Sequence, residues 1–395
     1  MMDKNTYDVI MVGGGVMGCA TAYYLLNKDP QIKIAIIEKD PTYEFNSSVL
    51  SDANIRLQFN IKENIQISQY GLEMLETFAE NMAVNDVKPD VAFRQQGNLF
   101  LADEAGKEAS LKGLETQQSL GCPVEWLEPT QVKERFPLYE VVDQLAGGVF
   151  GSKDGTMDPN AVLMGYKNKA VALGAEFIVD EVLEIVQADG EVSGVRLASG
   201  DEFSAKFVVN SAGAWGQKMA RTLGIELPVD PVKRHVFVLE TNAEPGELIY
   251  PLTVFPSGLY LVHEHGNIFM AGKSFDDDPV GINFDFKRQL FIDRLWPELV
   301  EFIPAFDQLK ITRGWAGLYA VNTFDGNAIL GEWPELKGFM LANGFSGHGF
   351  QQCHAVGRYL AELILGQTPS LNLAIFSPQR ILDNKPVFES AHKLV

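Results

Sequence analysis

The sequence predicts an α/β protein in which a Rossmann-type nucleotide-binding domain is interleaved with an α+β domain built on an antiparallel sheet. Two observations carry this prediction. Glycine-rich segments at 13–18 and 344–350, near opposite ends of the chain, each precede a long helical pattern. Between them, residues from about 228 to 317 contain short stretches of alternating apolar and polar residues, which are typical of antiparallel strands.

The two glycine-rich segments indicate the kind of ligand. A loop of this type exposes backbone N–H groups, and the helix behind it directs the positive end of its dipole toward whatever is bound there. Two such loops in one chain suggest a single long ligand, held at its phosphates by one loop and at its reactive ring by the other. FAD fits that description.

Composition and charge limit the function classes. A chain of 395 residues has room for roughly two domains, and 46% hydrophobic with 21% charged residues describe a folded globular protein. The formal net charge of −20 argues against a nucleic-acid partner, which requires a basic surface. Cys19, Cys122 and Cys353 are too widely spaced for a disulfide framework or a metal cluster, so we expect no metal.

The apolar stretch at 9–26 is not interpreted as a membrane span or a signal peptide. It contains four glycines, follows acidic residues and lacks a small-residue cleavage pattern. We therefore expect no transmembrane segment, no targeting segment and a cytoplasmic protein.

The first elements follow the order strand, helix, strand. Residues 7–13 form an apolar run, a helical pattern continues to about residue 27, and 32–37 form a second apolar run, so the helical crossover predicts parallel strands. Glu38 follows Gly18 by about 20 residues, where a dinucleotide fold uses an acidic side chain to accept hydrogen bonds from the adenosine ribose. The cofactor residues expected here are Gly13, Gly15, Val16, Met17, Gly18, Glu38 and Lys39, the last of which could instead be solvated.

The middle of the chain contains both helical and strand patterns. Residues 64–83 are predicted as one helix, and Asp158-Pro159 as the start of another with Asp158 as its N-cap. Residues 182–210 predict a three-stranded meander whose last strand runs into the small residues of 211–215. Further strands are expected at 236–239, 259–262, 268–271 and 338–342, and a helix at 349–365 that ends at Gly366.

This order predicts two domains that alternate along the chain. Residues 1–85, 150–225 and 320–395 would form the discontinuous cofactor-binding domain. Residues 86–149 and 226–319 would form the substrate or cap domain that lies over it.

Several motifs carry a family resemblance. The glycines of 13–18 with Glu38, the pair Ser47-Ser48, the segment 212–215 and the loop 344–350 together resemble the D-amino-acid-oxidase-like FAD-dependent oxidoreductases, which include sarcosine oxidase, glycine oxidase and dimethylglycine dehydrogenase. The runs at 47–56 and 233–238 most resemble the FOXRED1-like branch, and the likeness covers nearly the whole chain. It implies a GR2-like FAD-binding domain.

The resemblance also implies how FAD is held. Some family members attach the flavin through a cysteine in the tract matching 314–324, and this tract has none here, so noncovalent FAD is expected. Ser47 and Ser48 would contact the pyrophosphate or the ribityl chain, although an ordinary turn is the alternative. The backbone of Val182 would meet the adenine, and Ala212 and Gly213 would lie near the cofactor.

In this family the loop at 344–350 directs a helix N-terminus at the flavin N1–C2 edge, which becomes negative on reduction. His348 would be a ligand to the ring edge or would hold the loop through its imidazole. The residues expected at this edge are Gly344, Ser346, Gly347, His348, Gly349, Phe350 and Gln351.

Two positions depart from monomeric sarcosine oxidases. Gln351 stands where those enzymes have a lysine for the substrate carboxylate, and Lys273 is the only candidate near 269–273 for their oxygen-activating lysine. These departures count against fast oxygen reduction and against plain sarcosine as the substrate.

Substrate binding is therefore assigned to other side chains. The family often places an arginine that faces a carboxylate where Arg56 stands, and a guanidinium matches a carboxylate with two hydrogen bonds. Arg313 is at a family-typical position, with an internal ion pair as the alternative. Tyr260 and His263 are three residues apart and face opposite sides of a strand, so we choose Tyr260 as the inward one. The predicted catalytic set is Arg56, Tyr260, Arg313 and Gln351.

The sequence thus predicts a flavoenzyme that removes hydride from a C–N bond of a small amine or N-substituted amino acid, giving an imine. One alternative is 2-hydroxy-acid oxidation, with a base such as His263. Another is a low-turnover assembly factor of FOXRED1 type. The electron acceptor (oxygen or a carrier) and the oligomeric state are left open.

Overall fold

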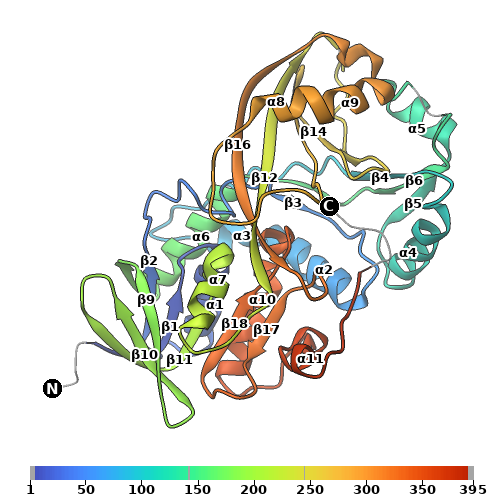
Figure 1. Cartoon of the computed structure of the whole chain (residues 1–395). Helices are drawn as coiled ribbons and strands as arrows, with labels where there is room; N and C mark the ends of the chain where they lie inside the picture. The colour runs from blue at the N-terminus through green and yellow to red at the C-terminus, as the bar shows by residue number, and fades with distance from the viewer. Residues whose placement is uncertain (1–4, 141–142, 244, 390–395) are drawn as a thin grey trace.

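The computed structural model describes residues 5–140, 143–243 and 245–389, and the parts of the predicted domain ranges at 1–4, 141–142, 244 and 390–395 lie outside this description. Two eight-stranded sheets dominate the structure (Figure 1). The fold is mixed α/β, as the sequence predicts. Along the described residues, no helix has the length and apolar character required to cross a membrane.

The first sheet contains the predicted nucleotide-binding core. Its main strands follow the order β17-β18-β11-β1-β2-β8, with β9 and β10 attached beside β11. The pairings of β1 with β2 and β11, of β2 with β8 and of β11 with β18 are parallel. The strands are β1 (Thr6–Val12), β2 (Ile34–Glu38), β8 (Glu176–Val179), β9 (Val182–Ala188), β10 (Glu191–Leu197), β11 (Glu202–Asn210), β17 (Ile329–Glu332) and β18 (Phe339–Asn343).

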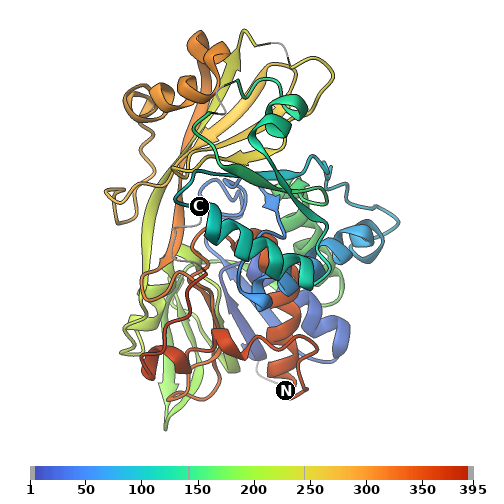
Figure 2. The same ribbon diagram turned by 90° about the vertical axis from the view of Figure 1, so that its right-hand side faces the viewer.

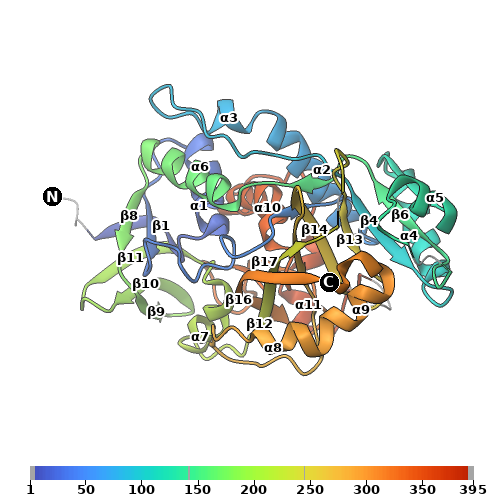
Figure 3. The same ribbon diagram turned by 90° about the horizontal axis from the view of Figure 1, so that it is seen from above.

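Long helices pack against one another on one face of this sheet. Helix α1 (Val16–Lys28) packs against α6 (Pro159–Ala172) and α10 (Gly349–Ile364), and α2 (Lys62–Glu76) packs against α10 (Figures 1 and 3). The crossing of α1 and α10 is close, because a Cβ at Gly357 would lie 2.9 Å from the backbone of Ala20. Segments from the two ends of the chain are therefore held side by side.

The second sheet is mostly antiparallel and has the order β16-β12-β15-β14-β13-β4-β6-β5. Its two long strands, β12 and β16, pair along nearly their whole length and run from the second sheet down beside the first (Figures 1 and 2). The strands are β4 (Asn98–Ala102), β5 (Val124–Leu127), β6 (Gly147–Gly151), β12 (Val229–Thr241), β13 (Leu252–Val254), β14 (Tyr260–His265), β15 (Ile268–Gly272) and β16 (Leu309–Asn322).

The remaining elements connect or cover the sheets. A short two-stranded sheet joins β3 (Asn54–Ile55) to β7 (Gly155–Thr156). The other helices are α3 (Phe78–Asn81), α4 (Lys107–Ser119), α5 (Pro129–Arg135), α7 (Gly216–Arg221), α8 (Arg288–Leu290), α9 (Trp296–Phe302) and α11 (Gln379–Leu382), with short 3-10 or π turns η1 (Gly213–Trp215), η2 (Phe291–Leu295), η3 (Pro304–Asp307) and η4 (Ala374–Phe376).

Local signals set several of these boundaries. The Asp158 carboxylate accepts hydrogen bonds from the N–H groups of Asn160 and Ala161 at 2.8 and 3.1 Å, which confirms the predicted N-cap of α6. Gly366 follows α10 with φ of +65°, as expected for a residue that ends a helix. The helical character predicted at 64–83 is confirmed, but the chain forms two helices, α2 and α3, that are separated at Thr77, and the buried Phe78 packs over Gly165 of α6.

Candidate active site

A cavity of about 270 Å³ lies next to the first sheet, at the N-termini of α1 and α10. It lies beyond the carboxyl ends of β1, β2 and β11, which is where open α/β sheets bind their ligands. Most of the predicted cofactor residues line it: Gly13, Gly15, Val16, Met17, Glu38, Lys39, Ser47, Ser48, Val182, Ala212, Gly213, Ser346, Gly347, Gly349 and Phe350.

The first glycine-rich turn is shaped by close backbone packing. Gly13 has φ of +102°, and a Cβ there would lie 2.8 Å from the carbonyl oxygen of Ser211. A Cβ at Gly18 would lie 2.2 Å from the carbonyl oxygen of Gly13, so Gly18 packs the helix onto the turn and does not line the cavity. Helix α1 starts at Gly15 without a side-chain cap, and its first N–H groups therefore suit an anionic ligand.

Glu38 holds this turn from the end of β2. Its carboxylate accepts hydrogen bonds from the N–H groups of Gly14 at 2.8 Å and Asp40 at 3.0 Å. A carboxylate has further lone pairs, so Glu38 can also accept from a ribose hydroxyl in the cavity. The ammonium of Lys39 lies 3.8 Å from the ring centroid of Trp215, and both side chains form one wall.

The second glycine-rich turn approaches the cavity from the other side. Ser346 has φ of +50° and Gly347 φ of +100°, and a Cβ at Gly347 would lie 2.5 Å from the ring of Tyr319. Helix α10 begins after His348, again without a side-chain cap. Gly344 packs against Asn322 and is not among the residues that line the cavity, and its contact with the cofactor stays a prediction.

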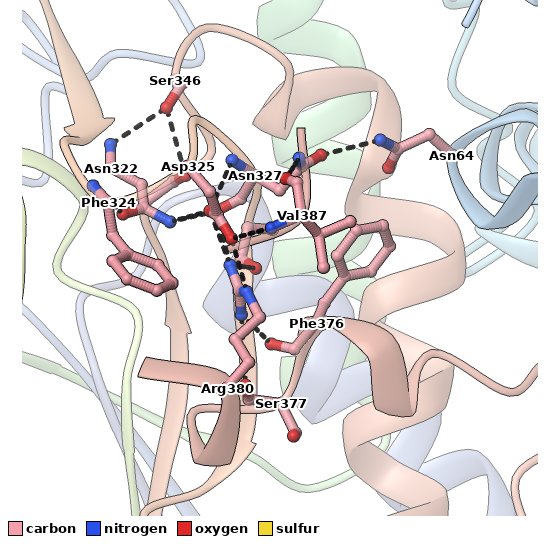
Figure 4. A network of polar contacts seen from close by, with 12 residues as sticks. Asn64, Asn322, Phe324, Asp325, Asn327, Ser346, Phe376, Ser377, Arg380 and Val387 are labelled. Atoms are coloured by element: carbon pink, nitrogen blue, oxygen red, sulfur yellow. Dashed lines mark hydrogen bonds and ion pairs between the residues drawn. The ribbon is translucent and has the colours of Figure 1, made fainter. Parts of the chain in front are cut away.

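A buried polar network supports this turn (Figure 4). The Ser346 hydroxyl accepts from the Asn322 N–H at 3.0 Å, and the Asn322 amide donates to Asp325 at 2.7 Å. Asp325 forms an ion pair with Arg380 of α11 at 2.7 Å, in which both side chains are almost completely buried. The C-terminal segment is thus tied to the loop that precedes α10.

A second, smaller cavity of about 60 Å³ adjoins the first and shares Ser51, Tyr319, Gly347 and Phe350 with it. Three of the predicted catalytic or loop residues, Arg56, Tyr260 and Gln351, line it together with His348. The other lining residues are Asp52, Ala53, Asn54, Phe100, Leu252 and Val254.

Arg56 is the charged centre of this cavity. Its side chain is buried, and the guanidinium donates to the carbonyl of Gln58 at 2.6 Å and to Nε2 of His348 at 3.0 Å. None of the ion pairs formed by described residues includes Arg56. Burial lowers the pKa of Arg56 to about 10, so the group stays positively charged at neutral pH.

Two neighbours orient this arginine. Because a guanidinium only donates, Nε2 of His348 accepts, and its ring proton is on Nδ1. The Oε1 atom of Gln351 accepts the backbone N–H of Arg56 at 2.9 Å, while Nε2 of Gln351 donates to no described residue. His348 and Gln351 therefore face the small cavity and do not line the larger one.

Other predicted candidates lie elsewhere. Arg313 is exposed on β16 and lines neither cavity, so the catalytic role predicted for it is not carried into the proposal below. Lys273 forms an ion pair with Glu298 at 2.6 Å. Nδ1 of His263 accepts from the Tyr250 N–H at 3.0 Å, and Nε2 lies 2.9 Å from the carbonyl oxygen of Gly266, so the ring braces a β-turn outside both cavities.

Sequence reasoning missed two residues of the small cavity, Asp52 and Tyr319. Asp52 stands four residues before Arg56 in a run that the resemblance already singled out, so the pairing of opposite charges was a usable signal. Tyr319 lies in the tract that was inspected only for a cysteine. Burial raises the pKa of the Asp52 carboxyl.

Fold and site together indicate a dinucleotide-binding oxidoreductase with a cofactor cavity and a smaller cavity that adjoins it. The family model for FAD dependent oxidoreductases matches residues 8–363, and the chain belongs to this family. The resemblance seen in the sequence is therefore confirmed, and so is FAD as the cofactor. No cysteine is among the described residues that line the cofactor cavity, which suits noncovalent binding.

Individual relatives cover nearly the same length. FAD-dependent oxidoreductase domain-containing protein 1 of Xenopus laevis is 35% identical over 97% of this chain and 84% of its own. Sarcosine oxidase subunit beta of Arthrobacter sp. is 27% identical over 98% of this chain and 93% of its own. The crystal structure of L-proline dehydrogenase from P. horikoshii superposes with a TM-score of 0.86 at 26% identity, covering 97% of this chain and all of that one.

The residues present fit FAD. Two uncapped helix N-termini meet one elongated cavity, and at Gly13 and Gly347 a side chain would collide with the walls of the turns that form it. In this arrangement the first turn of α1 would hold the diphosphate and Glu38 the ribose. The turn before α10 would face the edge of the flavin ring.

Proposed function

We propose that this oxidoreductase oxidises the C–N bond of a small amine or N-substituted amino acid, giving an imine that water hydrolyses. FAD, when bound, supplies the acceptor for the hydride that leaves the carbon beside the nitrogen. The chain's own residues then have to bind the substrate, orient that carbon and exclude water.

The observation that carries this proposal is the position of Arg56. The carboxylates of Glu389, Asp154 and Asp52 act on this buried guanidinium only from beyond ion-pair distance, so a ligand anion in direct contact would stabilise it further. Two of its five N–H groups are used by Gln58 and His348, and the others remain for a bidentate contact with a substrate carboxylate. A carboxylate held there would lie beside Gly347 and Phe350, which border the cofactor cavity.

The surrounding residues support the same chemistry. Phe100 and Phe350 wall the small cavity with apolar surface, which limits water around the reacting carbon. When FAD is bound, the N-terminus of α10 would face the ring edge that becomes negative on reduction, and the helix dipole would stabilise that charge. No strong general base is required to take a proton from the carbon, because the hydrogen leaves as hydride with both electrons of the C–H bond.

A third cavity supports a substituted amine as the substrate. It measures about 750 Å³ and shares Phe100 and Val254, which are paired neighbours on β4 and β13, with the small cavity. These two side chains form the partition between the spaces. An N-substituent that passes them would have room beyond the reacting centre.

The test is anaerobic reduction of the purified holoprotein, and the loss of flavin absorbance is the measured signal. The panel contains an N-methyl amino acid, a cyclic imino acid, the matching amines without a carboxylate, and 2-hydroxy acids. Reduction by the amino acids, and weaker reduction by amines that lack the carboxylate, supports the proposal. Reduction by a hydroxy acid alone would contradict it.

The two alternatives are outcomes of the same experiment. Hydroxy-acid oxidation requires a base near the substrate carbon, and His263 is already hydrogen-bonded outside the small cavity. A low-turnover flavoprotein of the assembly-factor kind would bind FAD and be reduced by no member of the panel.

A further inference from the structure

The small cavity holds a negative group as well as a positive one. Asp52 and Arg56 both line it, and they interact electrostatically. Among the described residues, no side chain forms a hydrogen bond or an ion pair with the Asp52 carboxylate, whose internal partner is its own backbone N–H. An acidic group and a basic group that share one enclosed space without pairing with each other match the two ends of a zwitterion.

The other polar groups of the cavity are equally open to a ligand. The hydroxyl groups of Tyr260 and Tyr319 make no hydrogen bond with a described residue, although burial raises the pKa of both phenols and keeps them protonated. Each can therefore donate to a ligand or accept from one. The cavity thus offers acceptors for an ammonium group on one side and the Arg56 donors on the other.

We propose that Asp52 binds the ammonium group of the substrate and accepts the proton that this group must lose before oxidation. This inference rests on the proposed function and names its substrate class, a zwitterionic amino or imino acid. The proton passes from the ammonium nitrogen to a carboxylate oxygen of Asp52, which leaves a neutral amine with a lone pair. Hydride then leaves the adjacent carbon with the C–H electron pair for FAD, while the nitrogen lone pair forms the C=N bond.

The electrostatic surroundings suit this role. Burial is the largest influence on Asp52, Glu264 also raises its pKa, and Arg56 opposes both. Tyr260 and Tyr319 are the titratable neighbours, and both remain neutral. A carboxyl whose proton affinity is raised is a better proton acceptor than an exposed one. Asp52 is therefore the base that takes a proton from the substrate nitrogen. It takes no proton from the substrate carbon.

The test begins with binding, so that it does not depend on turnover. 2-Aminoisobutyrate has no hydrogen on its central carbon and cannot lose hydride, and pivalate has the same shape with a methyl in place of the ammonium. Dissociation constants for both are measured from the change they cause in the flavin spectrum of the holoprotein. We expect the wild type to prefer 2-aminoisobutyrate at least about ten-fold and Asp52→Asn to lose that preference. Equal affinities in the wild type would overturn the proposal.

Reduction kinetics then test the proton transfer from the substrate ammonium group to Asp52. With a reducing amino acid, Asp52→Asn should lower the anaerobic reduction rate near pH 7 about 100-fold, and the rate should recover as rising pH supplies neutral amine. Asp52→Glu should restore part of the rate at pH 7. A variant as fast as the wild type at every pH would refute the role of Asp52.

The control is Asp307→Asn, which removes an exposed carboxylate that lines none of the three cavities and should leave the ligand preference unchanged. The outcomes separate the two proposals. A wild type that prefers 2-aminoisobutyrate but is reduced by no amine supports the zwitterion site and contradicts the proposed reaction. A wild type reduced by amines without any ligand preference does the opposite.

Discussion

At the scale of single residues, the site depends on side chains held in place by a few hydrogen bonds. Arg56 is fixed by the carbonyl of Gln58, by His348 and by the Gln351 contact to its backbone. Its charge is kept in a buried position where water cannot fully solvate it. In the proposed reaction a substrate carboxylate would replace solvent at Arg56, and the residue should govern binding more than the rate of the chemical step.

Replacing Arg56 by Met removes the charge while keeping an unbranched side chain. We expect the dissociation constant of a carboxylate-bearing substrate in anaerobic reduction to rise at least about 30-fold, which corresponds to about 2 kcal/mol. Amines without a carboxylate should be affected much less. Retention of the flavin spectrum checks the fold, and Arg56→Lys should give an intermediate value. An unchanged dissociation constant would contradict the assignment.

Gly13 occupies a position where a side chain larger than a hydrogen atom does not fit. Its φ of +102° and the 2.8 Å approach to Ser211 leave no room for a methyl group. Gly13→Ala should therefore displace the turn and lower the FAD content of purified protein, measured as the ratio of flavin to protein absorbance. The matched control is Gly190→Ala, where φ is +81° but open space surrounds the position, so about 1–2 kcal/mol of backbone strain is expected without loss of FAD.

At the scale of elements, the loop that precedes α10 and the C-terminal segment are connected through buried polar groups (Figure 4). Arg380 of α11 donates to both carboxylate oxygens of Asp325 and to the carbonyls of Phe376 and Ala328. Every oxygen in this set has lost water, so the guanidinium is needed to satisfy it.

Arg380→Met should leave the Asp325 carboxylate buried and unpaired. We expect a loss of about 3–5 kcal/mol in the free energy of unfolding, measured by chemical denaturation of the holoprotein. The control is Arg294→Met, which breaks an exposed ion pair with Asp277 and should cost less than about 1 kcal/mol. Equal effects of the two substitutions would show that the network does not hold the C-terminal segment.

Helix α10 also carries a pH-sensitive group. His354 is fully buried with Nδ1 2.6 Å from the Tyr166 hydroxyl, and burial lowers its pKa to about 4. Between pH 6.5 and 4 the unfolded chain binds a proton at this histidine and the folded chain does not, so stability falls as pH falls, by up to about 3 kcal/mol.

His354→Asn removes this titration while keeping a polar atom near Tyr166. The slope of unfolding free energy against pH between 6.5 and 4.5 should be shallower in the variant than in the wild type. Parallel slopes would show that the pKa of His354 is the same in the folded and the unfolded chain, which contradicts its lowering by burial.

Elements differ in how far the sequence predicts them. The start β1-α1-β2 follows from one local pattern of apolar residues, glycines and Glu38, so its order and its parallel pairing are confirmed. The break at Thr77 was not predicted, because it depends on Phe78 packing over Gly165 of another helix.

The composition of the small cavity also depends on contacts between segments that are distant in the sequence. Arg56 and Tyr260 lie together there only because strands β3 and β14, distant in sequence, face one space, and neither periodicity nor spacing reports such a meeting. Arg313 looked equivalent to Arg56 in the sequence, yet its strand presents it to solvent. Asp52 was overlooked because an acidic residue in a polar loop is usually solvated.

At the scale of the whole molecule, the two sheets meet where the cofactor and substrate cavities adjoin. β16 contributes Leu318, Tyr319 and Ala320 to the larger cavity, and Tyr260 of β14 reaches the smaller one. The domain boundaries predicted from the sequence remain a prediction. Tyr319 of the long strand β16 lines both cavities and so connects the second sheet to each of them.

The central claim is that FAD lies between the N-termini of α1 and α10 with a zwitterionic substrate beside it on Arg56. The most direct measurement is a crystal structure of the holoprotein with 2-aminoisobutyrate. We predict the diphosphate at the first turn of α1, the flavin edge at Gly347–Phe350, and the ligand carboxylate within hydrogen-bond distance of Arg56. A ligand bound away from Arg56, or a flavin ring that does not border the small cavity, would contradict this account.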